Sequence, residues 1–294
     1  DDRHGYVFFN NYQRKRRMDD HGGMILEGRC KEAPVEFPKL DLPSGSYGCF
    51  PYHFREGGSE LISTNATPLC RLRDEDGKVC VVFYGDWDPA FVWKDEKHFP
   101  VLHLDRKQAL QAWKVTLDQD YLFLSDDYVW EEDGKLHIEG EKETVIRCYP
   151  KLKDLSVLPD GFEACGQDQE FALYRRSEKA ENTRVTVTEE NRDEDSRIYN
   201  LKITSPGTWR DTILSLDFGG DKIEIFRDGE MLTDSYYTGE PVQISLRYFD
   251  FPEELQIKIY LLKEDTPRFL ERWPQMKDGC ACELCEVGVK DLVW

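Results

Sequence analysis

Short runs of alternating apolar and polar residues are the feature that most constrains how this chain folds. Turn dipeptides such as Asp133-Gly134 and Asp228-Gly229 separate neighbouring runs, and each run is long enough for one strand. Asp228-Gly229, between KIEIFR and EMLTDSYY, predicts the clearest hairpin. Many short strands at regular spacing predict an all-β protein made of antiparallel β-sandwiches or jelly rolls.

One stretch has helical character. Asp105 can cap the first amides of a helix that runs to Trp113, and Ala109, Leu110 and Trp113 would share one face of it. No second stretch in the sequence is comparable. The sequence therefore predicts one short helix near 105–113 and no helical layer.

The chain's 294 residues are too many for one small core, which predicts two or more domains. Between residues 149 and 169 proline, glycine and charged residues mix and the periodicity fades, so we place a domain junction near residue 160. The prediction is a β-sandwich region over 1–160 and a second β-domain over 161–294. A further subdivision of the first region near residue 75 is a hypothesis.

The composition excludes several classes of partner. A net charge of −19, from 58 acidic and 39 basic residues, repels phosphate backbones and argues against nucleic acid. No apolar run approaches the roughly 20 residues that span a bilayer, so no membrane partner is expected. Nine cysteines without a repeating framework favour reduced thiols and a cytoplasmic location. The chain begins at Asp1 without a signal region, which favours a piece of a longer protein.

The segment GCACELCEVGV places Cys280, Cys282 and Cys285 in a C-x-C-x-x-C spacing. A structural zinc site needs four ligands, usually in two separated pairs, and no second pair follows this one. Free cysteine also behaves as a small buried hydrophobic residue. We therefore predict a turn at Asp278-Gly279 followed by a terminal strand, with no metal and no cofactor.

Motifs that mark common active sites are missing from the sequence. The six histidines form no H-x-x-x-H or H-E-x-x-H pair, and there is no G-x-S-x-G word and no glycine-rich phosphate loop. We therefore predict no catalytic residue. Aromatic residues near turns are the candidates for binding, because an aromatic ring can stack on the apolar face of a sugar. These carbohydrate-binding candidates, for each of which core packing is the alternative, are Trp87, Trp93, Trp209, Tyr236 and Tyr237.

Three stretches occur in an order that carries a family resemblance. The first, RHGYVFFNNYQRKRRM, contains Phe8, Asn10, Asn11 and Tyr12. The second, FPKLDLPSGSYGCFPYHFREGGSELISTNATPLCRL, contains Pro43-Ser44-Gly45 and the run from Thr67 to Leu72. The third, LSLDFGGDKIEIFRDGEMLTDSYYTGEPVQISLRYF, has Asp221, Asp228-Gly229 and Gly239 in turns. In this order they resemble the region that follows the catalytic barrel in bacterial glycoside hydrolase family 35-type β-galactosidases.

The resemblance implies a galactose-binding-like jelly roll at the end of the chain and no catalytic activity in this chain. The family's catalysis belongs to a (β/α)₈ barrel with a retaining pair of glutamates, one of which follows an asparagine. This sequence has no Asn-Glu dipeptide and no alternating strand–helix pattern. We therefore expect a non-catalytic accessory region of a β-galactosidase that supports the barrel of the same polypeptide, contacts other subunits of an oligomer, or contacts galactoside. The alternatives are an autonomous carbohydrate-binding module, a subunit-interaction module and an enzyme of another type.

Overall fold

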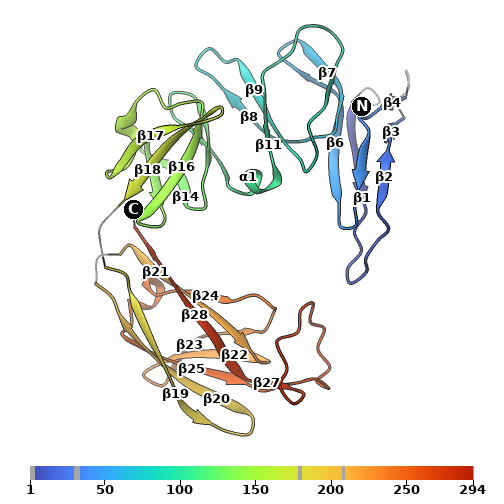
Figure 1. The fold of residues 1–294 in the computed structure, drawn as a ribbon. Helices are drawn as coiled ribbons and strands as arrows, with labels where there is room; N and C mark the ends of the chain where they lie inside the picture. Colours follow the sequence, from blue (N-terminus) through green and yellow to red (C-terminus); the bar gives the residue numbers. More distant parts are fainter. Residues whose placement is uncertain (1–3, 30–33, 178–180, 207–208, 294) are drawn as a thin grey trace. The chain divides into compact units, whose positions relative to one another are not determined.

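The structure, a computed structural model, describes residues 4–29, 34–177, 181–206 and 209–293 (Figure 1). Strands hold 58% of the residues and helices 4%, so the predicted all-β fold is confirmed. The chain divides into two compact units. The first contains Asp1–His137 and Val145–Arg175, and the second contains Ile138–Thr144 and Arg176–Trp294. Among the helices that the structure describes, none is long and apolar enough to cross a bilayer.

Three larger sheets form most of the first unit. Across the four-stranded sheet the order is β1 (Gly5–Asn10), β6 (Tyr47–Glu56), β7 (Ser59–Thr64) and β10 (Phe91–Trp93). The three-stranded sheet has the order β11 (Val101–Leu104), β9 (Val79–Tyr84) and β8 (Thr67–Arg73). The five-stranded sheet has the order β12 (Ala112–Thr116), β13 (Asp120–Leu124), β16 (Glu143–Tyr149), β18 (Phe171–Ser177) and β17 (Phe162–Asp168).

Smaller elements complete this part of the chain. The two-stranded pairs are β2 (His21–Met24) with β5 (Leu40–Leu42), β3 (Glu27–Gly28) with β4 (Val35–Glu36), and β14 (Tyr128–Glu132) with β15 (Lys135–Glu139). A single 3₁₀ turn, η1 (Leu155–Val157), precedes β17. Strands β11 and β9 pair in parallel, which departs from the predicted antiparallel arrangement. The long connection from Tyr84 to Val101 allows this pairing, because parallel neighbours need a crossover rather than a tight turn.

Alternation along strand β1 follows the sequence pattern. Val7 and Phe9 pack against a core cluster that contains the fully buried Phe50, whereas Tyr6 and Phe8 are exposed. Strand β13 differs, because all five of its residues are buried. Its Leu122 belongs to a core cluster that also draws residues from β8, β9 and β11. A strand covered on both faces is expected to be apolar throughout, and β13 reads DYLFL.

The predicted helix exists but is shorter than expected. Helix α1 (Arg106–Leu110) begins with a capping box, in which Asp105 accepts a hydrogen bond from the Gln108 amide at 2.7 Å and the Gln108 side chain accepts one from the Asp105 amide at 2.9 Å. The predicted apolar face is wrong. Leu110 is 84% exposed, and Trp113 lies in β12, where its indole nitrogen donates to the Ser125 carbonyl. The chain enters β12 at Ala112, so the helix ends before Trp113 can join its face.

The second unit is a β-sandwich. Its five-stranded sheet has the order β19 (Arg184–Arg192), β20 (Ser196–Thr204), β25 (Glu254–Tyr260), β22 (Lys222–Arg227) and β23 (Glu230–Tyr236). The three-stranded sheet has the order β24 (Val242–Ser245), β21 (Asp211–Gly219) and β28 (Glu283–Leu292). The remaining elements are the pair β26 (Leu262–Lys263) and β27 (Cys280–Ala281) and the 3₁₀ turn η2 (Arg247–Phe249).

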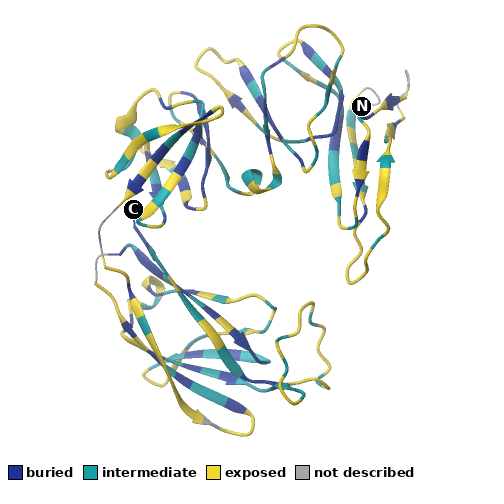
Figure 2. Ribbon diagram, in the orientation of Figure 1, coloured by how far each residue is buried: buried dark blue, intermediate teal, exposed yellow. Residues whose placement is uncertain are grey.

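One core cluster joins the two sheets of the sandwich. Leu201 and Ile257 from the five-stranded sheet are buried in the same cluster as Leu214 and Ile244 from the three-stranded sheet. Figure 2 shows the alternation of buried and exposed residues along these strands. Burying one such aliphatic side chain contributes roughly 1.5–3 kcal/mol. The second unit therefore has a hydrophobic core of its own.

Two of the predicted Asp-Gly turns are present, and both have the positive φ values that favour glycine. Asp228 and Gly229 join β22 to β23 with φ of 51° and 82°, the two positive values that a type I′ hairpin turn requires. Asp278 and Gly279 also have positive φ values, 53° and 75°, and precede β27. The predicted turn before the terminal strand is therefore present.

Along the sequence, the first unit ends at Arg175 and the second continues from Arg176, whereas the predicted domain junction lies near residue 160. Residue 160 lies before β17 and β18, which pair within the five-stranded sheet of the first unit. Residue 75 lies in the turn of the β8–β9 hairpin, where the Asp74 amide donates to the Lys78 carbonyl. The short segment Ile138–Thr144 belongs to the second unit, where Gly140 forms a β-bridge with Val293.

Candidate carbohydrate-binding site

Two of the predicted aromatic residues are part of the core of the first unit. Trp87 donates from its indole nitrogen to the Asp41 carbonyl at 2.7 Å and meets the rings of Phe9 and Phe50 edge-on. Trp93 stacks on His98, with ring centroids 4.4 Å apart. The rings of both tryptophans are therefore engaged by other side chains, as the core-packing alternative expects.

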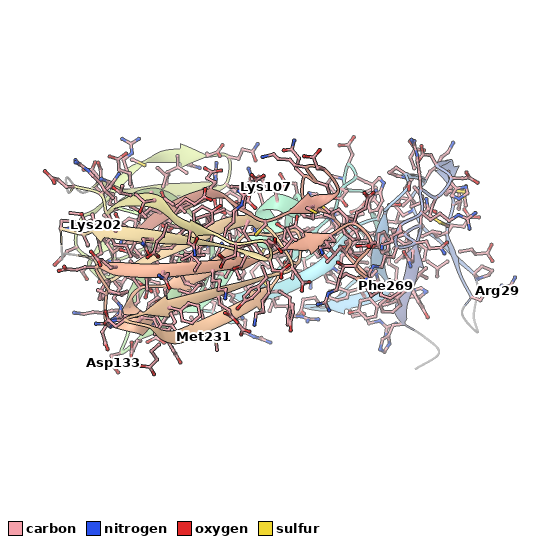
Figure 3. All side chains as sticks on the ribbon, turned by 90° about the horizontal axis from the view of Figure 1, so that it is seen from below. Arg29, Lys107, Asp133, Lys202, Met231 and Phe269 are labelled. Carbon is pink, nitrogen blue, oxygen red and sulfur yellow. The ribbon has the colours of Figure 1, made fainter. Side chains whose placement is uncertain are left out.

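Tyr236 and Tyr237 lie together at the end of β23, beside a pocket of about 120 Å³. Tyr237 packs edge-on against Phe218, and burial raises its pKa as the largest of several contributions. Tyr236 is exposed, and the Arg268 guanidinium lies 5.6 Å from its ring centroid. Arg268 is held by two 2.9 Å hydrogen bonds to the Asp221 carboxylate. Phe269, labelled in Figure 3, lines the same small pocket and is 95% exposed.

Trp209 lines a cavity with a volume of about 580 Å³. This volume falls within the roughly 300–1,000 Å³ that small-molecule sites occupy. Trp209 is only 8% exposed, and its indole nitrogen has no hydrogen-bond partner among the described residues. A buried N–H without an acceptor costs about 1–3 kcal/mol, so a ligand oxygen that accepts from it is favoured.

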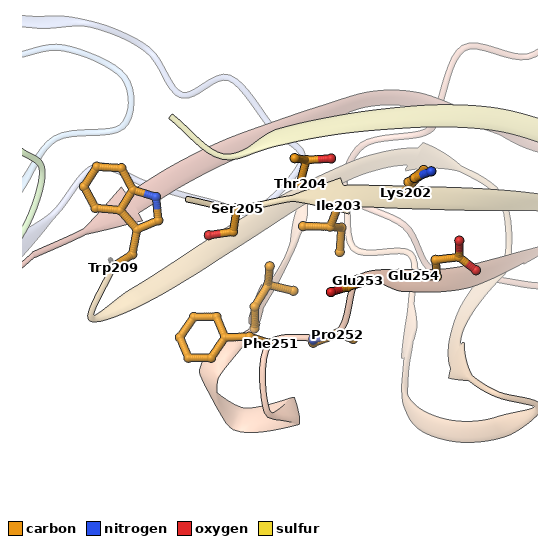
Figure 4. Close-up of a pocket in the computed structure, with 10 residues that line it drawn as sticks. Lys202, Ile203, Thr204, Ser205, Trp209, Phe251, Pro252, Glu253 and Glu254 are labelled. Carbon is orange, nitrogen blue, oxygen red and sulfur yellow. The ribbon is translucent and has the colours of Figure 1, made fainter. Parts of the chain in front are cut away.

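The walls of this cavity come from segments far apart in the sequence. They are the end of β20, the segment just before β21, the residue before η2, the loop after η2 and the start of β25. Figure 4 shows Trp209 and Phe251 toward one end of the pocket and Lys202 and Glu254 toward the other. The full set of lining residues is Lys202, Ile203, Thr204, Ser205, Trp209, Leu246, Phe251, Pro252, Glu253 and Glu254.

A strained loop presents Phe251 to the cavity. Asp250 and Phe251 both have left-handed backbones, with φ of 55° and 47°, which non-glycine residues seldom adopt. The Phe251 amide donates to the Leu246 carbonyl at 2.8 Å, which closes the loop after η2. Strain of this kind persists only where the surroundings hold it, and it often marks ligand sites.

Asp211, at the start of β21, holds that loop in place. The carboxylate is 3% exposed and accepts from the Ser245 hydroxyl at 2.6 Å and from the Arg247 amide at 3.0 Å. Because Trp209 is two residues upstream, one short segment supplies both the buried indole and the anchor of the opposite loop. Sequence reasoning selected Trp209 but missed Phe251 and Asp211, whose roles depend on this long-range contact.

Charges at the far end of the cavity suit a hydroxylated ligand. The carboxylates of Glu253 and Glu254 accept hydrogen bonds and the ammonium of Lys202 donates them, and all three side chains are exposed. The exposed ring of Phe251 offers an apolar surface beside them. An apolar ring face next to donors and acceptors matches the two sides of a sugar.

The cysteine segment does not gather metal ligands. The Cys282 thiol is buried and donates to the Ile259 carbonyl at 3.3 Å, whereas Cys285 is exposed on β28. Throughout the described parts of the chain, no group of three or more His, Cys, Asp or Glu side chains is arranged to hold a metal ion. These cysteines therefore occupy one inward and one outward position near the edge of the sandwich.

Comparisons with known proteins add nothing to the geometry. A scan against protein families finds no match for this chain, and a search of curated proteins finds none either.

Proposed function

We propose that this chain is the non-catalytic β-region of a β-galactosidase-type glycoside hydrolase, and that its second unit binds a galactoside beside Trp209. The order of the three stretches around Asn11, Thr67 and Asp228 supports the first part. One observation supports the second part. The indole N–H of Trp209 is buried in the wall of a 580 Å³ cavity and has no hydrogen-bond partner among the described residues.

The proposed pose uses both ends of the cavity. A ring hydroxyl accepts the hydrogen bond from Trp209, and the apolar face of the sugar lies against Phe251. Other hydroxyls donate to Glu253 or Glu254 and accept from Lys202. Each neutral hydrogen bond contributes about 1 kcal/mol net, so a monosaccharide is held weakly and a longer galactoside more tightly.

The surface proposed to contact the catalytic barrel lies in the first unit, on strand β1. Phe8 is 77% exposed on β1, and the exposed Tyr6 lies beside it with ring centroids 6.5 Å apart. Large exposed aromatic residues that gather in a patch are typical of protein interfaces. The proposed occupant is the catalytic barrel of the same polypeptide. A cytoplasmic location fits the free thiols of the eight cysteines that the structure describes.

Calorimetric titration of the chain with a galactoside such as lactose tests the site. We expect saturable binding, and Trp209→Phe should weaken it about fivefold, because the variant keeps an aromatic ring but loses the donor. Phe251→Ala should also weaken binding, and it leaves the strained backbone occupied by a non-glycine residue as before. Thermal unfolding of each variant shows whether the fold survives.

The matched control is Trp273→Phe, which changes a partly exposed tryptophan of the second unit outside the cavity lining. Equal affinity in Trp209→Phe and the unchanged chain would remove the proposed site. Turnover of a nitrophenyl galactoside by this chain alone would refute the non-catalytic assignment.

The second candidate is an autonomous carbohydrate-binding module. It is favoured by the fact that every residue lining the cavity belongs to the second unit. Galactoside binding by the chain without any association with a separately expressed barrel would select the module. Tight association with that barrel, lost in Phe8→Ser, would select the accessory region.

A further inference from the structure

A second cavity, of about 430 Å³, opens in the first unit where β6 changes partners. Strand β6 pairs with β1 from Tyr47 to Tyr52 and with β7 from Tyr52 onward. Tyr52 pairs with Gly5, the first residue of β1, and both residues line the cavity. Its lining residues are His4, Gly5, Tyr6, Tyr52, His53, Phe54, Arg55 and Arg71.

The charge of this lining is opposite to that of the protein. Among the described residues, two arginines, two histidines and no carboxylate line the cavity, in a chain with a net charge of −19 when histidine is counted as neutral. Arg55 and Arg71 are permanently charged and present planar donors that match a carboxylate or a sulfate. A local excess of positive charge on an acidic protein attracts anionic ligands to that place.

Two carboxylates outside the lining hold the basic groups in position. Glu60, whose side chain is 11% exposed, lies 2.7 Å from His53 Nδ1, 3.0 Å from Arg55 Nε and 3.4 Å from Lys94 Nζ. Glu56 lies 2.7 Å from Arg71 Nε. Glu60 and Glu56 together pair with three permanent cations, Arg55, Arg71 and Lys94, so the positive charges outnumber these two carboxylates by one.

The ionisation of Glu60 is protected by its partners. Burial is the largest contribution and raises the pKa of Glu60, but hydrogen bonds from His53, Arg55 and Lys94 and the charge of Arg55 outweigh it, so the pKa lies below its usual value. A carboxylate bound to Nδ1 fixes the orientation of an imidazole ring, as it does for histidines that bind ligands through the other nitrogen.

One residue at the cavity has an unusual backbone, and another is sterically restricted to glycine. His53 has a φ of 50°, in the left-handed region, although it lies within strand β6. This conformation costs a non-glycine residue about 1–2 kcal/mol. At Gly5, a Cβ atom would lie 2.7 Å from the Tyr52 hydroxyl, so only glycine leaves that hydroxyl in place. Strain retained at a cavity with convergent side chains is a mark of ligand sites.

The remaining wall is aromatic. Tyr6, Tyr52 and Phe54 line the cavity, and the Arg71 guanidinium lies 5.1 Å from the centroid of the Phe54 ring. The ring contact restrains the guanidinium, which also bonds to Glu56. A flat apolar surface beside fixed cations fits a ring that carries an anionic group.

We propose that this cavity of the first unit binds an acidic sugar, a pyranose ring bearing a carboxylate. Arg55 and Arg71 pair with the carboxylate, and the aromatic wall packs against the ring. The proposal that the ligand is an anion depends only on the charges of the residues that line the cavity. The proposal that the ligand is a sugar rests on the proposed function. The cavity itself lies in the other unit and shares no residue with the site around Trp209.

Titration of the full chain with galacturonate at low and at physiological salt tests the proposal. We expect saturable binding that weakens as salt rises, and Arg55→Gln and Arg71→Gln should each weaken it about tenfold, as expected for loss of a charged hydrogen bond. Arg71→Lys should recover only part of the affinity, because lysine lacks the planar donor pair. The matched control is Arg73→Gln, an exposed arginine two residues along β8 that lies outside the lining.

Other outcomes have defined meanings. Galacturonate binding that Arg73→Gln weakens as much as Arg71→Gln would overturn the site, since it would reflect net charge alone. Acetate or sulfate bound as tightly as galacturonate would overturn the sugar assignment. Galacturonate binding lost in Trp209→Phe but kept in Arg55→Gln and Arg71→Gln would overturn this proposal and leave the proposed function intact. No binding of galacturonate would overturn this proposal alone, provided that lactose still binds.

Discussion

Asn11 illustrates how one side chain ties separate segments together. Its amide nitrogen lies within hydrogen-bonding distance of three carbonyl oxygens, those of Asp19 at 2.9 Å, Leu42 at 3.0 Å and Pro43 at 3.1 Å. The adjacent Asn10 is exposed, and its side-chain oxygen accepts from the Tyr12 amide. The sequence resemblance treats the two asparagines alike, whereas the structure gives only Asn11 a buried donor role.

Asn11→Asp is therefore expected to destabilise the first unit. The variant places a carboxylate against three carbonyl oxygens and removes their donor, at a cost of about 3 kcal/mol. Asn10→Asp is the control, because an aspartate at that position still accepts from the Tyr12 amide. Urea unfolding followed by fluorescence measures both variants, and equal midpoints for the two would contradict the assigned role of Asn11.

At the scale of elements, local signals predicted what local geometry controls. The hairpin at Asp228-Gly229 and the capping box at Asp105 are present because turn and cap residues act over a few positions. The parallel pairing of β11 with β9 and the early end of α1 were not predicted. Both features depend on which distant strand pairs with the strand that follows, and a short stretch of sequence does not encode that pairing.

The β22–β23 turn allows a clean test of backbone strain. Gly229 has a φ of 82°, and a Cβ atom there would meet no other atom within 4 Å. Gly229→Ala should therefore cost about 1–2 kcal/mol through the left-handed backbone alone. Gly288→Ala is the comparison in β28, where the backbone is ordinary and the nearest atom is 3.4 Å away. Thermal unfolding should show a lower midpoint for the first variant only.

At the scale of the whole molecule, one buried arginine joins segments that the sequence separates. Arg176 is 0% exposed, and its guanidinium donates to the Ile138 carbonyl at 3.1 Å and to the Glu141 carbonyl at 2.9 Å. These contacts attach the segment Ile138–Thr144 to the second unit. A charged residue with no exposure persists only with hydrogen bonds of this kind.

Arg176→Met should destabilise the second unit by about 2–4 kcal/mol, because one buried and one partly buried carbonyl lose their donor while the methylene volume is largely kept. Arg175→Met changes the exposed neighbour and should have little effect. Differential scanning calorimetry compares the two variants. An equal shift of the unfolding midpoint in both variants would show that the hydrogen bonds of Arg176 add no stability of their own.

The sequence by itself determined the all-β class, the hairpin turns, the capped helix and Trp209 as a candidate for binding. Each of these depends on residues a few positions apart, where alternation, φ preference and capping act. Only the tertiary structure brought Phe251 and Asp211 to Trp209, and Arg71 to His53 and Arg55. Cavities and charge clusters form from side chains of distant strands, and strand pairing, which no local pattern encodes, decides which of them meet.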